Sequence, residues 1–313
     1  MAEELVDVGA SPPFLIEPPK KQPKSKNWKG MKPIHPNLPQ LPFLACIAGP
    51  RHGGKTVLLY NLLEKRALCY GDAFKPSNII LFSPTYTFDD TLHPLKIQNV
   101  YSPPTTLDWV VGHVKQQQKK HMDSDNMSGV LLVLEDITSI KGAWKVLEDL
   151  GYTGRHFQIH VLAVAHKMSS ILRGVRTQLQ QWMLFKPHEE SEREWILTMF
   201  SRKRTWEVWE NAMRRAWDIE YNFLYIDFER KGIENIYRSG FNEPLFTPEE
   251  MGFIESAGPV FKPDSPEFYK EHGKEHVSNL KKQVMQDTDS GDEKKQVIEP
   301  PAKRKRGRPK KNK

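Results

Sequence analysis

The stretch FLACIAGPRHGGKT, residues 43–56, decides the fold of this chain. Its first six residues are apolar and too few for a helix of normal length, so they predict a buried strand. An amphipathic stretch, residues 56–67, predicts a helix directly after it. Between them, eight residues match the pattern G-x-x-x-x-G-K-[ST] at every fixed position; they are Gly49, Pro50, Arg51, His52, Gly53, Gly54, Lys55 and Thr56.

A strand, a glycine-rich loop and a helix in this order predict a phosphate-binding loop, and all eight loop residues are candidate ATP ligands. Gly49 and Gly54 allow the backbone to approach the phosphates, and Lys55 is expected to reach the outer phosphates. The Thr56 hydroxyl is a candidate ligand of Mg²⁺. A glycine-rich turn that binds nothing is the alternative interpretation.

Further short apolar runs predict the rest of a sheet. The expected strands are 43–48, 78–83, 130–134, 159–165 and 182–185, and helices are expected over 56–67 and 107–121. Short apolar strands that alternate with helices are typical of a mostly parallel sheet covered by helices on both faces. We therefore expect an α/β fold of the P-loop NTPase type.

The segment after residue 185 predicts a helical and hairpin appendage to this sheet. Helices are expected over 189–200 and 206–217, followed by a hairpin with arms at 221–228 and 234–238. Four large side chains recur at helical spacing, and we interpret them as core rather than as a base-stacking surface; they are Trp206, Trp209, Met213 and Trp217.

The two ends of the chain differ in composition from its centre. Residues 1–42 contain nine of the 24 prolines, and residues 259–313 are polar with almost no aromatic residues, so both are expected to be disordered tails. Residues 43–258 are then one P-loop ATPase domain. Two cysteines provide no disulfide framework, and no apolar run approaches the roughly 20 residues that span a bilayer. We expect an intracellular protein with no membrane partner.

A second acidic element follows the apolar run 130–134, which ends in Glu135 and Asp136. Carboxylates at such a strand end hold magnesium and orient the attacking water in P-loop NTPases. Most such elements end in Asp-Glu or Asp-Asp, so Glu135 in the first place is a departure. We expect Glu135 to bind magnesium and Asp136 to orient water. The exchange of these roles and a plain strand end are the alternatives.

An ordered series of residues follows: Gly154-Arg155-His156, a strand, His166, Arg173 and Arg176, and a further strand. Together with the two earlier motifs, this series resembles the poxvirus-type and adenovirus-type genome-packaging ATPases of the FtsK-HerA superfamily. The resemblance covers roughly residues 43–240. The phosphate loop and the acidic strand end are unspecific motifs, whereas the ordered series is moderately specific.

The resemblance implies a RecA-like sheet of the additional-strand type, in which the strand ending at His166 lies between those of the phosphate loop and Glu135. His166 then lies near the γ-phosphate as a sensor, where poxvirus-type members usually have Gln. Such ATPases work as homo-oligomeric rings, which implies an arginine finger supplied to the neighbouring subunit. Arg155 is the first candidate, Arg176 the second and Arg173 the third. A salt bridge or a surface role is the alternative for each of them.

The last 11 residues contain eight cations and no acid. Their centre resembles an AT-hook, whose Arg-Gly-Arg core enters a narrow A·T-rich minor groove. The same run is similar to a nuclear import signal, and a charged solubilising tail is the alternative. The residues that we expect to bind DNA are Arg306, Gly307, Arg308 and Pro309.

These features lead us to expect an ATP-hydrolysing, DNA-translocating motor that packages a viral double-stranded DNA genome into a capsid. Its expected partners are DNA, other copies of itself and a capsid or portal-like vertex protein, in the host nucleus or the virion. A replicative helicase or another DNA pump of the same superfamily is the alternative. A nucleotide-dependent DNA-binding switch with weak hydrolysis is a further one.

Overall fold

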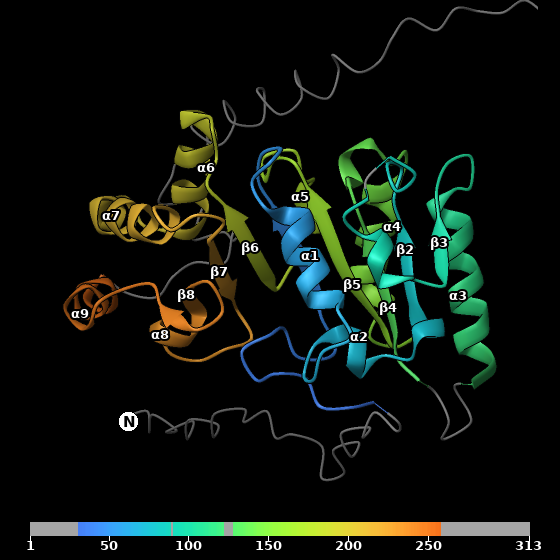
Figure 1. Ribbon diagram of the computed structural model, residues 1–313. Helices are drawn as coiled ribbons and strands as arrows, with labels where there is room; N and C mark the ends of the chain where they lie inside the picture. Colours follow the sequence, from blue (N-terminus) through green and yellow to red (C-terminus); the bar gives the residue numbers. More distant parts are fainter. Residues whose placement is uncertain (1–30, 89, 122–127, 258–313) are drawn as a thin grey trace, which may run out of the picture.

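The computed structural model describes residues 31–88, 90–121 and 128–257 (Figure 1). The strands expected at 130–134 and 159–165 are confirmed to the residue, and the other three differ by one residue at one or both ends. Within the described residues, one sheet contains β1 (Leu44–Ala48), β2 (Ile79–Phe82), β3 (Asn99–Tyr101), β4 (Val130–Leu134), β5 (Ile159–Ala165), β6 (Gln181–Phe185), β7 (Phe223–Asp227), β8 (Tyr237–Ser239) and β9 (Glu243–Pro244).

The strand order is β3-β2-β4-β5-β1-β6-β7-β8-β9. Pairs from β3 to β6 are parallel, and pairs from β6 to β9 are antiparallel. Strand β5 lies between β1 and β4, which confirms the RecA-like, additional-strand α/β fold. Ala48 pairs with Ala165 and Leu134 with Ala163, so β1, β4 and β5 end together at what we call the carboxyl edge of the sheet.

Helices cover both faces of the sheet (Figure 1). One hydrophobic cluster joins the sheet to α1 and α2, and a second joins it to α3, α4, α5, α6, α7 and α9. None of the helices in the described part of the chain has the length and apolarity needed to cross a membrane. The helices are α1 (Lys55–Leu63), α2 (Tyr70–Ala73), α3 (Leu107–His121), α4 (Ala143–Thr153), α5 (Arg173–Arg176), α6 (Glu190–Phe200), α7 (Trp206–Trp217), α8 (Ile233–Ile236) and α9 (Pro248–Ser256), with short 3₁₀ helices at Pro76–Asn78, His93–Leu95, Ile137–Ser139 and Lys203–Thr205.

The appendage consists of α6, α7 and the antiparallel strands β7 to β9. The four large side chains that recur along α7 belong to the core, as expected. Three of them, Trp209, Met213 and Trp217, are buried, and Trp206 is half-buried. The expected second hairpin arm is wrong at its start, because residues 233–236 form α8. Gly232 has φ 84°, and its carbonyl accepts from two amides of the next turn, which makes the chain helical there.

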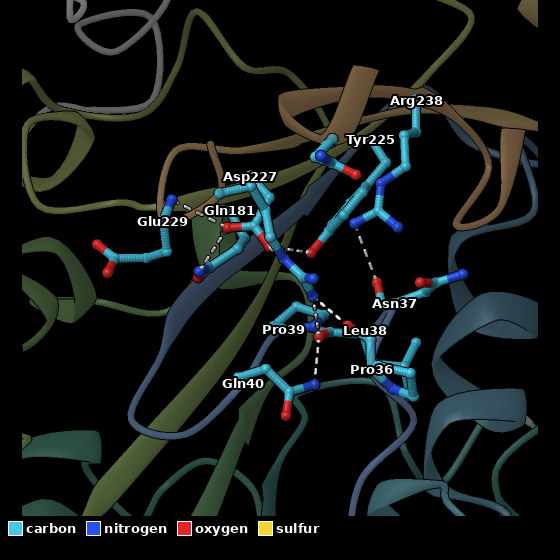
Figure 2. Close-up of polar contacts among 12 residues, drawn as sticks. Pro36, Asn37, Leu38, Pro39, Gln40, Gln181, Tyr225, Asp227, Glu229 and Arg238 are labelled. Carbon is cyan, nitrogen blue, oxygen red and sulfur yellow. Dashed lines mark hydrogen bonds and ion pairs between the residues drawn. The ribbon is translucent and has the colours of Figure 1, made fainter. Parts of the chain in front are cut away.

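Residues 31–42, which we expected in the proline-rich tail, pack onto the sheet instead. Figure 2 shows residues 36–40, which we call the N-terminal strap, beside β7 and β8. Leu38 is buried, and the carbonyl of Pro39 accepts a hydrogen bond from the Tyr70 hydroxyl at 2.9 Å. Arg230 donates to the carbonyls of Pro36 and Leu38. Side chains from distant parts of the sequence therefore hold the strap on the fold by hydrogen bonds to its backbone. The composition of the strap itself gives no sign of these bonds.

Candidate functional site

The phosphate loop joins β1 to α1 at the carboxyl edge (Figure 1). Gly49 has no room for a side chain, because a Cβ there would lie 2.6 Å from the Phe185 Cβ. Gly54 has φ 96°, a left-handed conformation that favours glycine. A Cβ on Gly54 would also lie 3.2 Å from ring atoms of both Phe185 and Tyr221. The two fixed glycines of the motif are therefore required by packing and by backbone conformation.

Lys55 and Thr56 begin α1. The Lys55 ammonium donates to the carbonyl of Pro50 at 2.7 Å, so it lies within the curve of the loop. Burial lowers the pKa of Lys55 to about 8, although the nearby carboxylates of Asp136 and Glu135 act in the opposite direction. An ammonium that burial destabilises gains the most from an anion placed beside it. The loop is thus arranged for phosphate.

Glu135 directly follows β4, and its side chain is buried. Its Oε2 accepts a hydrogen bond from the Ser83 hydroxyl at 2.6 Å, and its Oε1 lies 3.4 Å from the Thr56 hydroxyl. Ser83 follows β2, the strand next to β4, so two neighbouring strands fix this carboxylate. The result is a carboxylate oxygen and a hydroxyl oxygen side by side at the start of α1.

Asp136 and His166 meet at the same edge, one residue beyond Glu135 and β5 respectively. The Asp136 Oδ1 lies 3.1 Å from His166 Nε2 and 3.0 Å from the Thr138 hydroxyl. The hydrogen bond from His166 lowers the pKa of Asp136, against the opposite effect of burial. Asp136 also has a left-handed backbone, with φ 45° and ψ 53°. The structure therefore brings the expected acid and the expected sensor into direct contact.

The oxygens around Thr56 fit a magnesium ion. In P-loop sites Mg²⁺ takes one or two protein oxygens and completes its shell with phosphates and water. Across the described residues, no three His, Cys, Asp or Glu side chains come together as a self-sufficient metal site. Thr56 and Glu135 supply the two protein oxygens that a nucleotide-dependent site needs, and the donor set consists of the hard ligands that Mg²⁺ prefers.

The three candidate finger arginines lie in different surroundings. Arg155 is exposed just before β5, at the opposite edge of the sheet from the phosphate loop. It lies beside a cavity of about 400 Å³ that Leu44 and Gln178 also line. Arg176 is buried, donates to the carbonyl of Ile171 and lies over the Trp195 ring. Because Arg176 is buried and makes these contacts, it stabilises the fold of its own subunit. Arg173 is exposed on α5.

Sequence reasoning missed two residues that support the site. Ser83 fixes Glu135, and a polar residue at the end of a strand next to the acidic strand was the available signal. Glu192 is buried, and its Oε1 accepts from the amides of Met168 and Ser169, which fixes the loop after His166. Nothing local distinguishes Glu192 from ordinary acidic residues in a first helical turn. The expected DNA-binding residues 306–309 lie outside the described residues.

Comparisons with solved structures give several likenesses of low identity. EssC (ATPases 2 and 3) from Geobacillus thermodenitrificans matches at 13% identity and a TM-score of 0.44, over 74% of this chain and 49% of that chain. The cytoplasmic domain of the Thermomonospora curvata type VII secretion ATPase EccC matches at 15% and 0.42, over 61% and 24%. This chain thus spans less than half of either of them.

The genome packaging NTPase B204 from Sulfolobus turreted icosahedral virus 2, in complex with ATP-gammaS, matches at 15% identity and a TM-score of 0.38, over 60% of this chain and 93% of that chain. No curated protein sequence matches the chain. The sequence profile described as Poxvirus A32 protein matches residues 34–206, which is more than half of the 313 residues. This match confirms the poxvirus-type resemblance, and the chain belongs to the poxvirus A32 protein family.

Proposed function

We propose that this chain is an ATPase that moves double-stranded DNA into a viral capsid. One observation carries the proposal: three adjacent parallel strands bring the phosphate loop, the Glu135 and Asp136 carboxylates and His166 to one edge of the sheet. A phosphate cradle, an acidic metal shell and a polar sensor are the parts that hydrolysis of a nucleoside triphosphate requires.

We assign the following roles in ATP hydrolysis to the residues of the site. The loop amides and Lys55 hold the phosphates, while Thr56 and Glu135 hold Mg²⁺, which when bound neutralises charge on the outer phosphates. Asp136 orients the attacking water. His166 is the polar sensor, and its contact with Asp136 also holds that carboxylate in place. The opposite assignment of the two carboxylates fits less well, because Ser83 and Thr56 already engage both oxygens of Glu135.

The family supports DNA as the substrate and a ring of identical subunits as the working form. We infer that a neighbouring subunit supplies Arg155 as the finger and that the basic tail, residues 303–313, adds contacts to DNA. A capsid or portal-like vertex protein is the proposed partner, and assembly takes place in the host nucleus or the virion. A replicative helicase uses the same site chemistry and is the competing function.

The test of the site is hydrolysis by Lys55→Ala. The variant loses a phosphate ligand, so we expect ATP turnover to fall by about 100-fold or more. Lys145→Ala removes an exposed lysine of α4 and serves as the matched control with normal turnover. Circular dichroism checks that both variants are folded. Normal turnover in folded Lys55→Ala would overturn the proposal.

A further inference from the structure

Tyr221 lies beside the phosphate loop, although it is 165 residues or more away along the chain. It belongs to the turn between α7 and β7. A Cβ on Gly54 would lie 3.2 Å from Cδ1 and 3.4 Å from Cβ of Tyr221, so the tyrosine is in contact with the loop at the start of α1. Tyr221 is nevertheless 62% exposed. A large aromatic side chain therefore contacts the phosphate loop and is still mostly exposed to solvent.

The backbone of Tyr221 is strained. Its φ is 57°, and a bulky residue with positive φ is a clear outlier. The next residue anchors this conformation, because the side-chain amide of Asn222 donates through Nδ2 to the Ala216 carbonyl at 2.9 Å and to the Ser239 hydroxyl at 2.8 Å. The surrounding fold thus maintains a conformation that tyrosine disfavours. Such strain is concentrated at functional sites.

The strand order shows which part of a nucleotide Tyr221 faces. Glu135, Asp136 and His166 follow β4 and β5, so the outer phosphates and their metal lie on that side of β1. The opposite side of β1 holds β6 and β7. Phe185 pairs with Phe223, which places the beginning of β7 and the turn before it at the carboxyl edge. Tyr221 therefore lies on the side of the loop away from the two carboxylates and His166, where there is room for the base of a nucleotide held by its phosphates.

We propose that Tyr221 is the platform on which the base of the bound nucleotide stacks, an inference that rests on the proposed nucleotide site. Val57 is 53% exposed one turn after Gly54, and Ile219 is 61% exposed in the same turn as Tyr221. Each of the two segments that meet here, the start of α1 and the turn before β7, thus carries a further exposed apolar side chain. Stacking on an aromatic ring tolerates any base, so this site selects for a nucleobase and not for one particular purine.

The experiment compares binding of ATP and of inorganic tripolyphosphate, which has no base, to the full-length chain. Tyr221→Asn removes the ring but keeps a residue that tolerates positive φ. Tyr221→Phe keeps the ring without the hydroxyl. Phe253→Asn removes an aromatic side chain that is 48% exposed on α9 and is the matched control. Titration calorimetry at one magnesium concentration gives the dissociation constants.

We expect Tyr221→Asn to weaken ATP binding by about 5- to 150-fold, which is the equivalent of the roughly 1–3 kcal/mol that one stacked base contributes. Its tripolyphosphate affinity should equal that of the wild type, and Tyr221→Phe and Phe253→Asn should bind ATP normally. Equal ATP affinity in wild type and Tyr221→Asn would overturn this inference and leave the nucleotide site intact. Loss of DNA affinity alone would also overturn it. Absence of tripolyphosphate and ATP binding in the wild type would instead contradict the proposed function.

Discussion

The protonation of Lys55 connects burial to nucleotide binding. Its pKa of about 8 means that the amine is mostly neutral at pH 9 and mostly charged at pH 7. Phosphates placed beside it favour the charged form and raise this pKa again. We therefore predict that ATP binding takes up close to one proton at pH 9 and little at pH 7. Calorimetry in buffers of different ionisation enthalpy measures this uptake.

Lys55→Arg is the control for proton uptake, because a guanidinium stays charged throughout this pH range. The variant should bind ATP at pH 9 without taking up the proton. The lowered pKa of Lys55 also makes the free energy of unfolding depend on pH. Lys55 holds its proton less tightly in the folded chain than in the unfolded one, so its burial costs stability below pH 8, and this cost falls as the pH rises through 8. Equal proton uptake by Lys55→Arg and wild type would assign the titration to another group.

We predict that changing Glu135 and Asp136 separately to their amides affects different steps, ATP binding in one variant and ATP hydrolysis in the other. Glu135→Gln removes a proposed metal ligand, so magnesium-dependent ATP binding should weaken. Asp136→Asn removes the group that orients water, so binding should persist while turnover falls by about 100-fold or more. Equilibrium binding and single-turnover hydrolysis separate these effects. Normal hydrolysis in both variants would show that β4 does not carry the catalytic acids.

At the scale of elements, the N-terminal strap joins the start of β1 to the antiparallel end of the sheet (Figure 2). The Asp227 carboxylate is buried and accepts from Arg230, from Gln181 at 3.1 Å and from the Tyr225 hydroxyl at 3.0 Å. Arg230 also donates to two strap carbonyls. One guanidinium therefore holds a buried charge and the strap together.

Arg230→Ala should lower the free energy of unfolding by about 1.5–3 kcal/mol, because it removes hydrogen bonds to a buried charged group. Arg193→Ala breaks the surface pairs with Glu190 and Glu210 and should cost at most about 1 kcal/mol. Urea unfolding of both variants gives the comparison. If the two variants lose equal stability, the strap is not held by this network.

Local patterns predict the elements that carry the chemistry, and long-range contacts decide the rest. The phosphate loop, β4 and β5 have apolar runs and motifs that need no distant partner for recognition. The strap was missed because its order depends on Arg230 and Arg238, nearly 200 residues away. The position of Tyr221 beside Gly54 was missed for the same reason, since it depends on the β6–β7 pairing. The short strands β3 and β9 offer too little periodicity to be predicted.

At the scale of the whole molecule, the position of Arg155 predicts cooperation between subunits. Strand β5 has seven residues and separates Arg155 from the carboxyl edge by about 20 Å, so Arg155 cannot reach the phosphate loop of its own subunit. In the proposed ring Arg155 acts on the neighbouring subunit, so mixing Arg155→Ala subunits with wild-type subunits should lower ATP turnover by more than the mutant fraction. Arg173→Ala, mixed in the same way, is the comparison for the weaker candidate. A strictly proportional loss with Arg155→Ala would contradict a finger that acts on the neighbour.

We propose that ATP hydrolysis at this phosphate loop moves the chain along double-stranded DNA. Displacement of a third strand from a DNA triplex measures such movement directly, because a translocating ring removes the strand without separating the duplex. We predict ATP-dependent displacement by the wild-type chain and none by Lys55→Ala, with the duplex left intact. Wild-type chain that hydrolyses ATP on this DNA and leaves the triplex in place, or that unwinds the duplex instead, would contradict the account.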